Sequence, residues 1–149
     1  MEAPYEIVYV VEDWYDGQRS GFADNQQNPH FFRSLHLDIE NNVDYNSDED
    51  RFKLTPVSKQ VVEWAVEDHQ LWLKWDEARR AGTLRQERHD EVRILPEDRA
   101  RDQELRDMIE QHLASQSAPS FIVRGEVNAG FGGGKVRWRG LDEAVPTDI

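Results

Sequence analysis

The segment Val61–Trp75, VVEWAVEDHQLWLKW, decides the fold, because its apolar residues recur with the spacing of an α-helix. On a helical projection of ~100° per residue, Asp68 falls near the centre of one apolar arc, and charged side chains occupy the opposite side. We therefore expect an amphipathic helix that docks its tryptophans into the core. The arc also holds Val57, Val61, Trp64, Ala65, Leu71, Trp72, Trp75 and Ala78.

A carboxylate inside an apolar arc requires a partner, because an unpaired buried carboxylate is costly or takes up a proton. We expect Arg19 to be the partner of Asp68, since a guanidinium binds a carboxylate in bidentate fashion, and His30 is the second candidate. The favoured interpretation is a structural ion pair that fixes the helix against a sheet. The alternative is a pocket built from Asp16, Arg19, His30 and Asp68.

Local signals place the ends of this helix and predict a second one. Thr55 and Pro56 resemble a capping hydroxyl followed by proline at the first helical position. The helix is expected to run to about Ala81, with Gly82 as its stop. A second helix is predicted to open at Pro96 and to carry Leu105, Ile109, His112 and Leu113 on one face.

The remaining apolar segments alternate in the manner of strands. Three precede the helices and form a meander, and two follow them as a hairpin around a glycine-rich loop. The fold class is therefore α+β: an antiparallel sheet, made of the N-terminal three-stranded meander plus the C-terminal hairpin, with two helices packed on one face. An alternative separates the hairpin from the meander. The predicted strands are 5–13, 19–24, 30–37, 121–127 and 135–139.

Length and composition indicate one folded domain over residues 1–140 and a frayed tail over residues 141–149. The chain has 149 residues, 38% of them hydrophobic, which is enough for a single core. It contains no cysteine, so disulfides, thiolate metal sites and cysteine nucleophiles are excluded. The net charge of -12 opposes binding to nucleic acid and to anionic membrane surfaces.

No motif names a cofactor, a metal or a reaction. Residues 44–50 imitate the alternating ligands of a calcium loop but lack its glycine and its bidentate glutamate. Residues 130–135 share only their composition with a phosphate-binding loop. No apolar window is long enough for a membrane span, and the N-terminal segment reads as a strand rather than a signal peptide, so a cytoplasmic location is expected.

Charge is unevenly distributed along the chain. The acidic segment 38–50, together with Trp14, supplies the predicted partner-binding residues Trp14, Asp44, Asp48 and Asp50. The last hairpin is locally basic at Arg124, Lys135, Arg137 and Arg139, beside Phe131 and Trp138, a mixture that stacks and neutralises nucleic acid in other proteins. Because of the overall charge, we expect a basic protein partner or self-association instead.

Four short stretches together resemble a family of small bacterial proteins that has no assigned activity. They are Trp14–Gly21 and Pro29–Phe32, with the pattern YDGxRxG…PHxF, then Glu67–Trp75, with the pattern EDxxLWxxW, and Leu95–Arg99. The resemblance covers most of the chain. It implies a bacterial, stand-alone domain and transfers no catalytic residues.

The first functional hypothesis is a non-catalytic interaction protein, such as an immunity protein, an antitoxin-like protein or an accessory subunit. It rests on acidity, small size and the lack of catalytic motifs. The second is a small-molecule-binding domain or hydrolase-like enzyme that uses the pocket described above. A third is an acidic mimic of nucleic acid.

Overall fold

The computed structural model describes residues 3–14, 18–35, 50–83, 93–115 and 118–141. The chain divides into two compact units. One contains Met1–Ser58 and Gln116–Ile149, and holds every strand; the other is Lys59–Ser115, and holds the helices. The predicted frayed tail lies outside the described residues except for Leu141.

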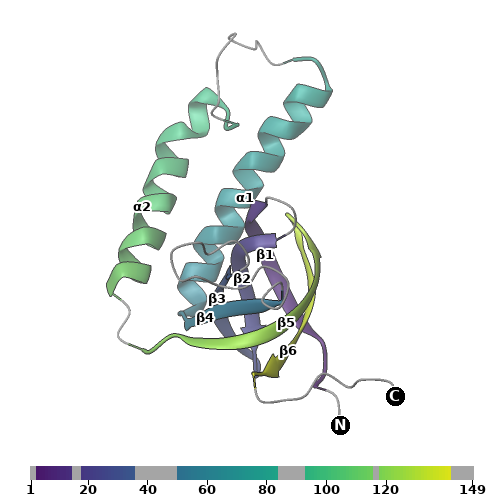
Figure 1. The fold of residues 1–149 in the computed structure, drawn as a ribbon. Helices are drawn as coiled ribbons and strands as arrows, with labels where there is room; N and C mark the ends of the chain where they lie inside the picture. Colours follow the sequence, from purple (N-terminus) through teal and green to yellow (C-terminus); the bar gives the residue numbers. More distant parts are fainter. Residues whose placement is uncertain (1–2, 15–17, 36–49, 84–92, 116–117, 142–149) are drawn as a thin grey trace. The chain divides into compact units, whose positions relative to one another are not determined.

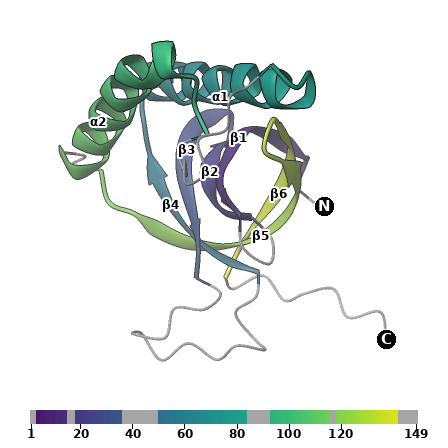
Figure 2. The same ribbon diagram turned by 90° about the horizontal axis from the view of Figure 1, so that it is seen from above.

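The first unit is a closed barrel of antiparallel strands in the order β1-β2-β3-β4-β5-β6 (Figures 1 and 2). The ring closes where Ile7 of β1 pairs with Lys135 of β6. Antiparallel strands with two helices confirm the predicted α+β class, and the alternative in which the hairpin stands apart is wrong. The strands are β1 Glu6–Trp14, β2 Gln18–Asn25, β3 Asn28–Ser34, β4 Arg51–Pro56, β5 Phe121–Gly130 and β6 Gly133–Gly140.

Strand β4 links the meander to the hairpin and was not predicted as a strand. Thr55 and Pro56 belong to β4, so the predicted helix start at these residues is wrong, and α1 begins at Lys59. A proline also suits the last residue of a strand, because its fixed φ is compatible with extended backbone. The hydroxyl oxygens of Thr55 and Ser120 lie 2.8 Å apart, at the end of β4 and just before β5. Both helices therefore fall, in chain order, between two strands that pair with each other.

The turns are shorter than the sequence indicated. Gln26 and Gln27 alone connect β2 to β3, with φ values of 52° and 67°, as a two-residue hairpin turn requires. Strands β5 and β6 pair as far as Gly130 and Gly133, so the predicted loop 128–134 shrinks to two residues. Gly133 has φ 107°, and a Cβ there would lie 2.4 Å from the Val8 carbonyl oxygen, so only glycine fits this close approach.

Aromatic side chains fill the interior of the barrel. Phe32, Phe52 and Trp138 lie with ring centroids 5.5 to 6.1 Å apart. Trp138 is 5% exposed, and its indole Nε1 donates to the Asp24 carbonyl oxygen at 2.8 Å. Gly125 makes room for this indole, because a Cβ at that position would lie 2.4 Å from the ring. A small closed barrel is filled in this way by its own side chains.

The second unit is a pair of helices lying side by side, α1 Lys59–Arg80 and α2 Arg99–Ser115, the latter preceded by the short 3-10 helix η1 Pro96–Asp98 (Figure 1). Helix α1 ends as predicted, since Gly82 adopts φ 70°. The tryptophans of α1 are half-buried, rather than buried as a core cluster requires. Among its described residues, the buried apolar side chains of this unit are Val61, Val62, Ala65, Ile94, Leu105 and Ile109.

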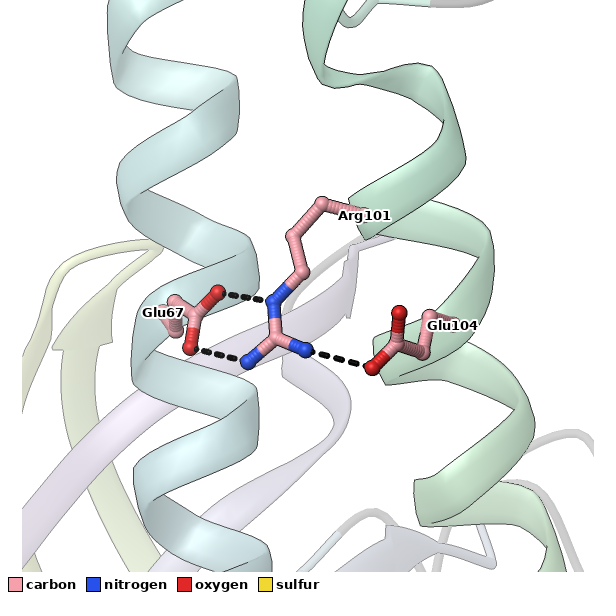
Figure 3. Close-up of polar contacts among 3 residues, drawn as sticks. All are labelled: Glu67, Arg101 and Glu104. Carbon is pink, nitrogen blue, oxygen red and sulfur yellow. Dashed lines mark hydrogen bonds and ion pairs between the residues drawn. The ribbon is translucent and has the colours of Figure 1, made fainter.

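An arginine in the first turn of α2 joins the two helices. Arg101 of α2 donates from Nε and Nη2 to both carboxylate oxygens of Glu67 on α1, at 2.5 and 2.7 Å, and from Nη1 to Glu104 at 2.7 Å (Figure 3). This bidentate geometry sets the relative register of the helices. The hydrogen bonds from Arg101 lower the pKa of Glu67 below its ordinary value.

Candidate functional site

The structure describes three of the four predicted pocket residues, and two of them, Arg19 and His30, lie on the barrel. Asp16 lies outside the described residues. Arg19 and His30 both belong to the inner side of the sheet, because Gly21 pairs with Phe32 and Ala23 pairs with His30. Arg19 precedes Ala23 by four residues, which is a separation of about 13 Å along the strand. The two side chains therefore start from different levels of the barrel.

His30 has the surroundings of a structural histidine. Its side chain is buried, its Nδ1 lies 2.8 Å from the Asn28 carbonyl oxygen, and its ring packs edge-on against Phe121 at 5.7 Å. A carbonyl oxygen accepts only, so Nδ1 carries the proton in this contact. The backbone of its own hairpin thus holds the ring.

Asp68 lies on α1, as predicted, and is partly shielded from solvent. Its side chain is 19% exposed, and its Oδ2 lies 4.0 Å from Nε of Arg106 on α2. The same Nε lies 3.1 Å from Asp102, so one guanidinium serves two carboxylates. Arg106 was not among the predicted partners, because the projection of a single helix does not show which neighbour faces it. A bond from Asp68 to Arg19 or His30 stays a prediction.

The predicted partner-binding residues fall mostly outside the described part of the chain. Asp44 and Asp48 lie there, as does the side chain of Trp14, although its backbone closes β1 opposite Gln18. Asp50 is described and is engaged within the barrel. Its Oδ1 accepts from Arg124 at 2.7 Å, and its carbonyl oxygen accepts from the Gly125 amide at 2.8 Å.

A second candidate site covers the outer side of strands β3 to β6. Alternation along each strand sorts the side chains, because Phe32, Phe52, Leu54, Val123 and Trp138 point into the core. Their sequence neighbours consequently point outward, and most of these are basic. We call this surface the basic face; it consists of Arg33, Arg51, Lys53, Ile122, Arg124 and Arg139.

The strand register places these cations directly beside one another. Arg33 pairs with Lys53 across β3 and β4, and Arg124 of β5 lies between Arg51 on one side and Arg139 on the other. Residues opposite each other on one side of a sheet have Cβ atoms about 5 Å apart, and like charges there destabilise the sheet. Arg33 and Lys53 therefore form an unfavourable cross-strand pair, whereas the charge of Arg124 is balanced by Asp50, whose Oδ1 lies 2.7 Å from Nη1 of that arginine.

Local acids offset this charge only in part. Asp50 neutralises Arg124, and Glu126 lies 3.8 Å from Arg137 at the border of the basic face. Among the described residues, no carboxylate lies within ion-pair distance of Arg33, Lys53 or Arg139. In the sequence, many acids of this unit fall in the segments 1–2, 15–17, 36–49 and 142–149, which contain no lysine or arginine and lie outside the described residues.

The aromatic residues of the basic hairpin do not lie among its cations. Trp138 was considered as a stacking residue beside the arginines, but it lies inside the barrel with its indole bonded to Asp24. Phe131 is exposed, at the tip of the hairpin between the paired residues Gly130 and Gly133. The alternation of Lys135, Val136, Arg137 and Trp138 already contained this signal, since it assigns the tryptophan to the side opposite the cations.

Other kinds of site have less support in the described ranges. No group of three or more histidine and acidic side chains within them is arranged to hold a metal ion. None of the helices there has the length and apolarity needed to cross a membrane.

Comparison with known proteins gives no family for the chain. No protein-family model matches it, and no curated protein or solved structure does either. The resemblance to small bacterial proteins stays a prediction, and a functional argument for this chain rests on its own residues.

Proposed function

We propose that the protein is a non-catalytic interaction domain that binds an anionic macromolecule through the basic face of its barrel. The observation that carries the proposal is the run of adjacent cations across β3, β4, β5 and β6, in which Arg33 lies directly beside Lys53. The described surface thus favours a partner opposite in charge to the basic protein expected from the net charge of the chain.

Like charges at paired positions lower the stability of the sheet. Exposed cross-strand positions accept uncharged β-formers or opposite charges, which stabilise by roughly 0.2–1 kcal/mol per pair. Arg33 beside Lys53 forgoes that gain. Surface charges that lower stability are expected where a ligand supplies the missing counter-charge.

The net negative charge of the chain does not prevent this binding. At physiological ionic strength the Debye length is about 8 Å, so an acid farther than this from the basic face is largely screened. Adjacent cations of the basic face lie within that distance of one another and act together on a ligand in contact with them. Binding should therefore survive at physiological salt and weaken at higher salt.

The packing of the barrel supports a binding role rather than catalysis. Enzymes of the barrel class place substrate in an interior cavity or at a cleft with converging polar groups. Here Phe32, Phe52 and Trp138 pack against one another in the interior.

Retention on an immobilised sulfated polysaccharide tests the proposal. The double variant Arg33→Gln/Lys53→Gln removes two cations from the basic face, and Lys59→Gln/Arg93→Gln removes two exposed cations from the helical unit as a control of identical net charge. We expect the wild type and the control to elute at the same salt concentration and the first variant to elute earlier. Equal elution of all three proteins would refute the proposal.

The folded state of the variants is measured alongside. Relief of a like-charge pair should leave Arg33→Gln/Lys53→Gln as stable as the wild type or more stable in urea unfolding. Loss of retention in a variant of undiminished stability then reports on binding alone. A stability loss in this variant would contradict the energetic argument directly.

A further inference from the structure

We infer that the partner of the basic face is an acidic polypeptide segment that places an apolar side chain on Ile122, rather than a nucleic acid. This inference rests on the proposed function and names the chemistry of its ligand.

Ile122 is an apolar residue within the cluster of cations. Its side chain is 44% exposed. Lys53 lies directly opposite it on β4, and Arg124 follows two residues later on the same side of β5. An aliphatic side chain in this position gains nothing from a phosphate, but it gains from contact with another apolar group that displaces water.

Nucleic-acid binding by a sheet requires aromatic platforms on which the bases stack. The six residues of the basic face include none, and Phe31, which borders it two residues before Arg33, is partly buried with its ring packed against Phe22 at 5.3 Å. Trp138 is buried within the barrel. Tyr5 is 44% exposed, but one side of its ring is occupied by the guanidinium of Arg137, whose Cζ lies 4.0 Å from the ring centroid. Phe131 is exposed at the hairpin tip, beyond the basic face.

The spacing of the basic face matches an extended peptide. Lys53 and Arg51 are two residues apart on β4, as are Ile122 and Arg124 on β5, so same-side residues recur every ~6.6 Å. An extended segment presents its own alternate side chains at the same interval. An acidic side chain can then reach Arg124 or Arg139 while the next side chain on that edge covers Ile122.

Fluorescence anisotropy with three labelled probes tests the inference. The first is an extended peptide that alternates glutamate and leucine, the second replaces every leucine with serine, and the third is a single-stranded oligonucleotide with the same number of charges. We expect the leucine peptide to bind about five- to tenfold more tightly than the serine peptide. The oligonucleotide should bind no better than the serine peptide.

The variant Ile122→Ser separates the apolar contribution from the charge. It should remove the advantage of the leucine peptide and leave binding of the serine peptide unchanged, whereas Arg33→Gln/Lys53→Gln should weaken both peptides. Retention of the advantage in Ile122→Ser would overturn the inference. Ile122 is exposed, so the substitution leaves the core intact.

The remaining outcomes distinguish this inference from the proposed function. Tighter binding of the oligonucleotide, lost in Arg33→Gln/Lys53→Gln, would overturn the inference and retain an anion-binding face. Self-association of the wild type that the same variant abolishes would replace the peptide with a second copy of this chain. If no probe binds, both the inference and the proposed function fail.

Discussion

Replacement of Gly125 by alanine should destabilise the barrel by about 1–3 kcal/mol, because the new methyl group enters space that the Trp138 ring occupies. A Cβ at this position would lie 2.4 and 2.7 Å from two ring carbons of Trp138 and 3.0 Å from a ring carbon of Phe52. Carbon atoms in contact prefer about 3.5–4.0 Å, so the indole must retreat by roughly 1 Å.

The ring has little freedom to retreat. Phe32 and Phe52 pack on it, and Nε1 donates to the Asp24 carbonyl oxygen at 2.8 Å. Breaking that hydrogen bond would add about 1 kcal/mol. The lower entropy of the unfolded chain with alanine offsets about 0.4–1 kcal/mol, which leaves the net loss stated above.

Urea unfolding followed by tryptophan fluorescence measures this loss, and Gly130→Ala is the matched control. Gly130 lies on the same strand, and nothing is within 4 Å of the Cβ built there, so its substitution should be neutral or slightly stabilising. Equal stability of Gly125→Ala and Gly130→Ala would refute the packing argument. A second test combines Gly125→Ala with Trp138→Leu: the two losses must be less than additive if the ring causes the first.

Three further predictions concern single residues. Gln27→Gly should increase the free energy of unfolding by about 0.5–1 kcal/mol and so raise the urea midpoint, because Gln27 adopts φ 67°, a conformation that costs glycine less. Burial, together with the hydrogen bond to Asp24, raises the pKa of Tyr9 to about 12. In a titration followed by tyrosinate absorbance, Tyr9→Phe should therefore remove an ionisation step near pH 12. The stability that this group contributes should persist below pH 10 and disappear as the pH rises towards 12. The pKa of Glu67 is lowered from 4.5, so its contribution is present above that pH and lost on acidification; urea midpoints of wild type and Glu67→Gln should differ at pH 7 and converge in acid.

Periodicity predicted most elements of this fold, because it depends on neighbours along the chain. The helix through Val61–Trp75 and its stop at Gly82 follow from local spacing and from the conformational freedom of glycine. Strand β4 was missed because Thr55 and Pro56 are equally good at starting a helix and at ending a strand, and tertiary pairing with β3 and β5 decided between them.

Closure of the sheet was beyond the reach of local patterns. It requires β1 to pair with β6, two segments from opposite ends of the chain, and it requires Gly21 and Gly125 where the ring crowds its own interior. A glycine inside an alternating segment signals a close approach but does not identify the neighbour that approaches. The sequence therefore predicted an antiparallel sheet without β4 and did not predict that the sheet closes.

For the candidate site, the sequence predicts which side of its strand each residue faces but not which residue of the next strand lies beside it. Alternation alone assigns Lys53, Ile122 and Arg139 to the outer side of their strands, and that much is readable from the sequence. The unfavourable pairing of Arg33 with Lys53 appears only when the register of two strands is known, since a slip of one residue would exchange every contact. The net charge of -12 suggested a basic partner. The proposal of an acidic partner depends on the strand register, which the sequence alone did not provide. A charge average over a chain predicts long-range steering, but contact binding depends on which cations the fold makes adjacent.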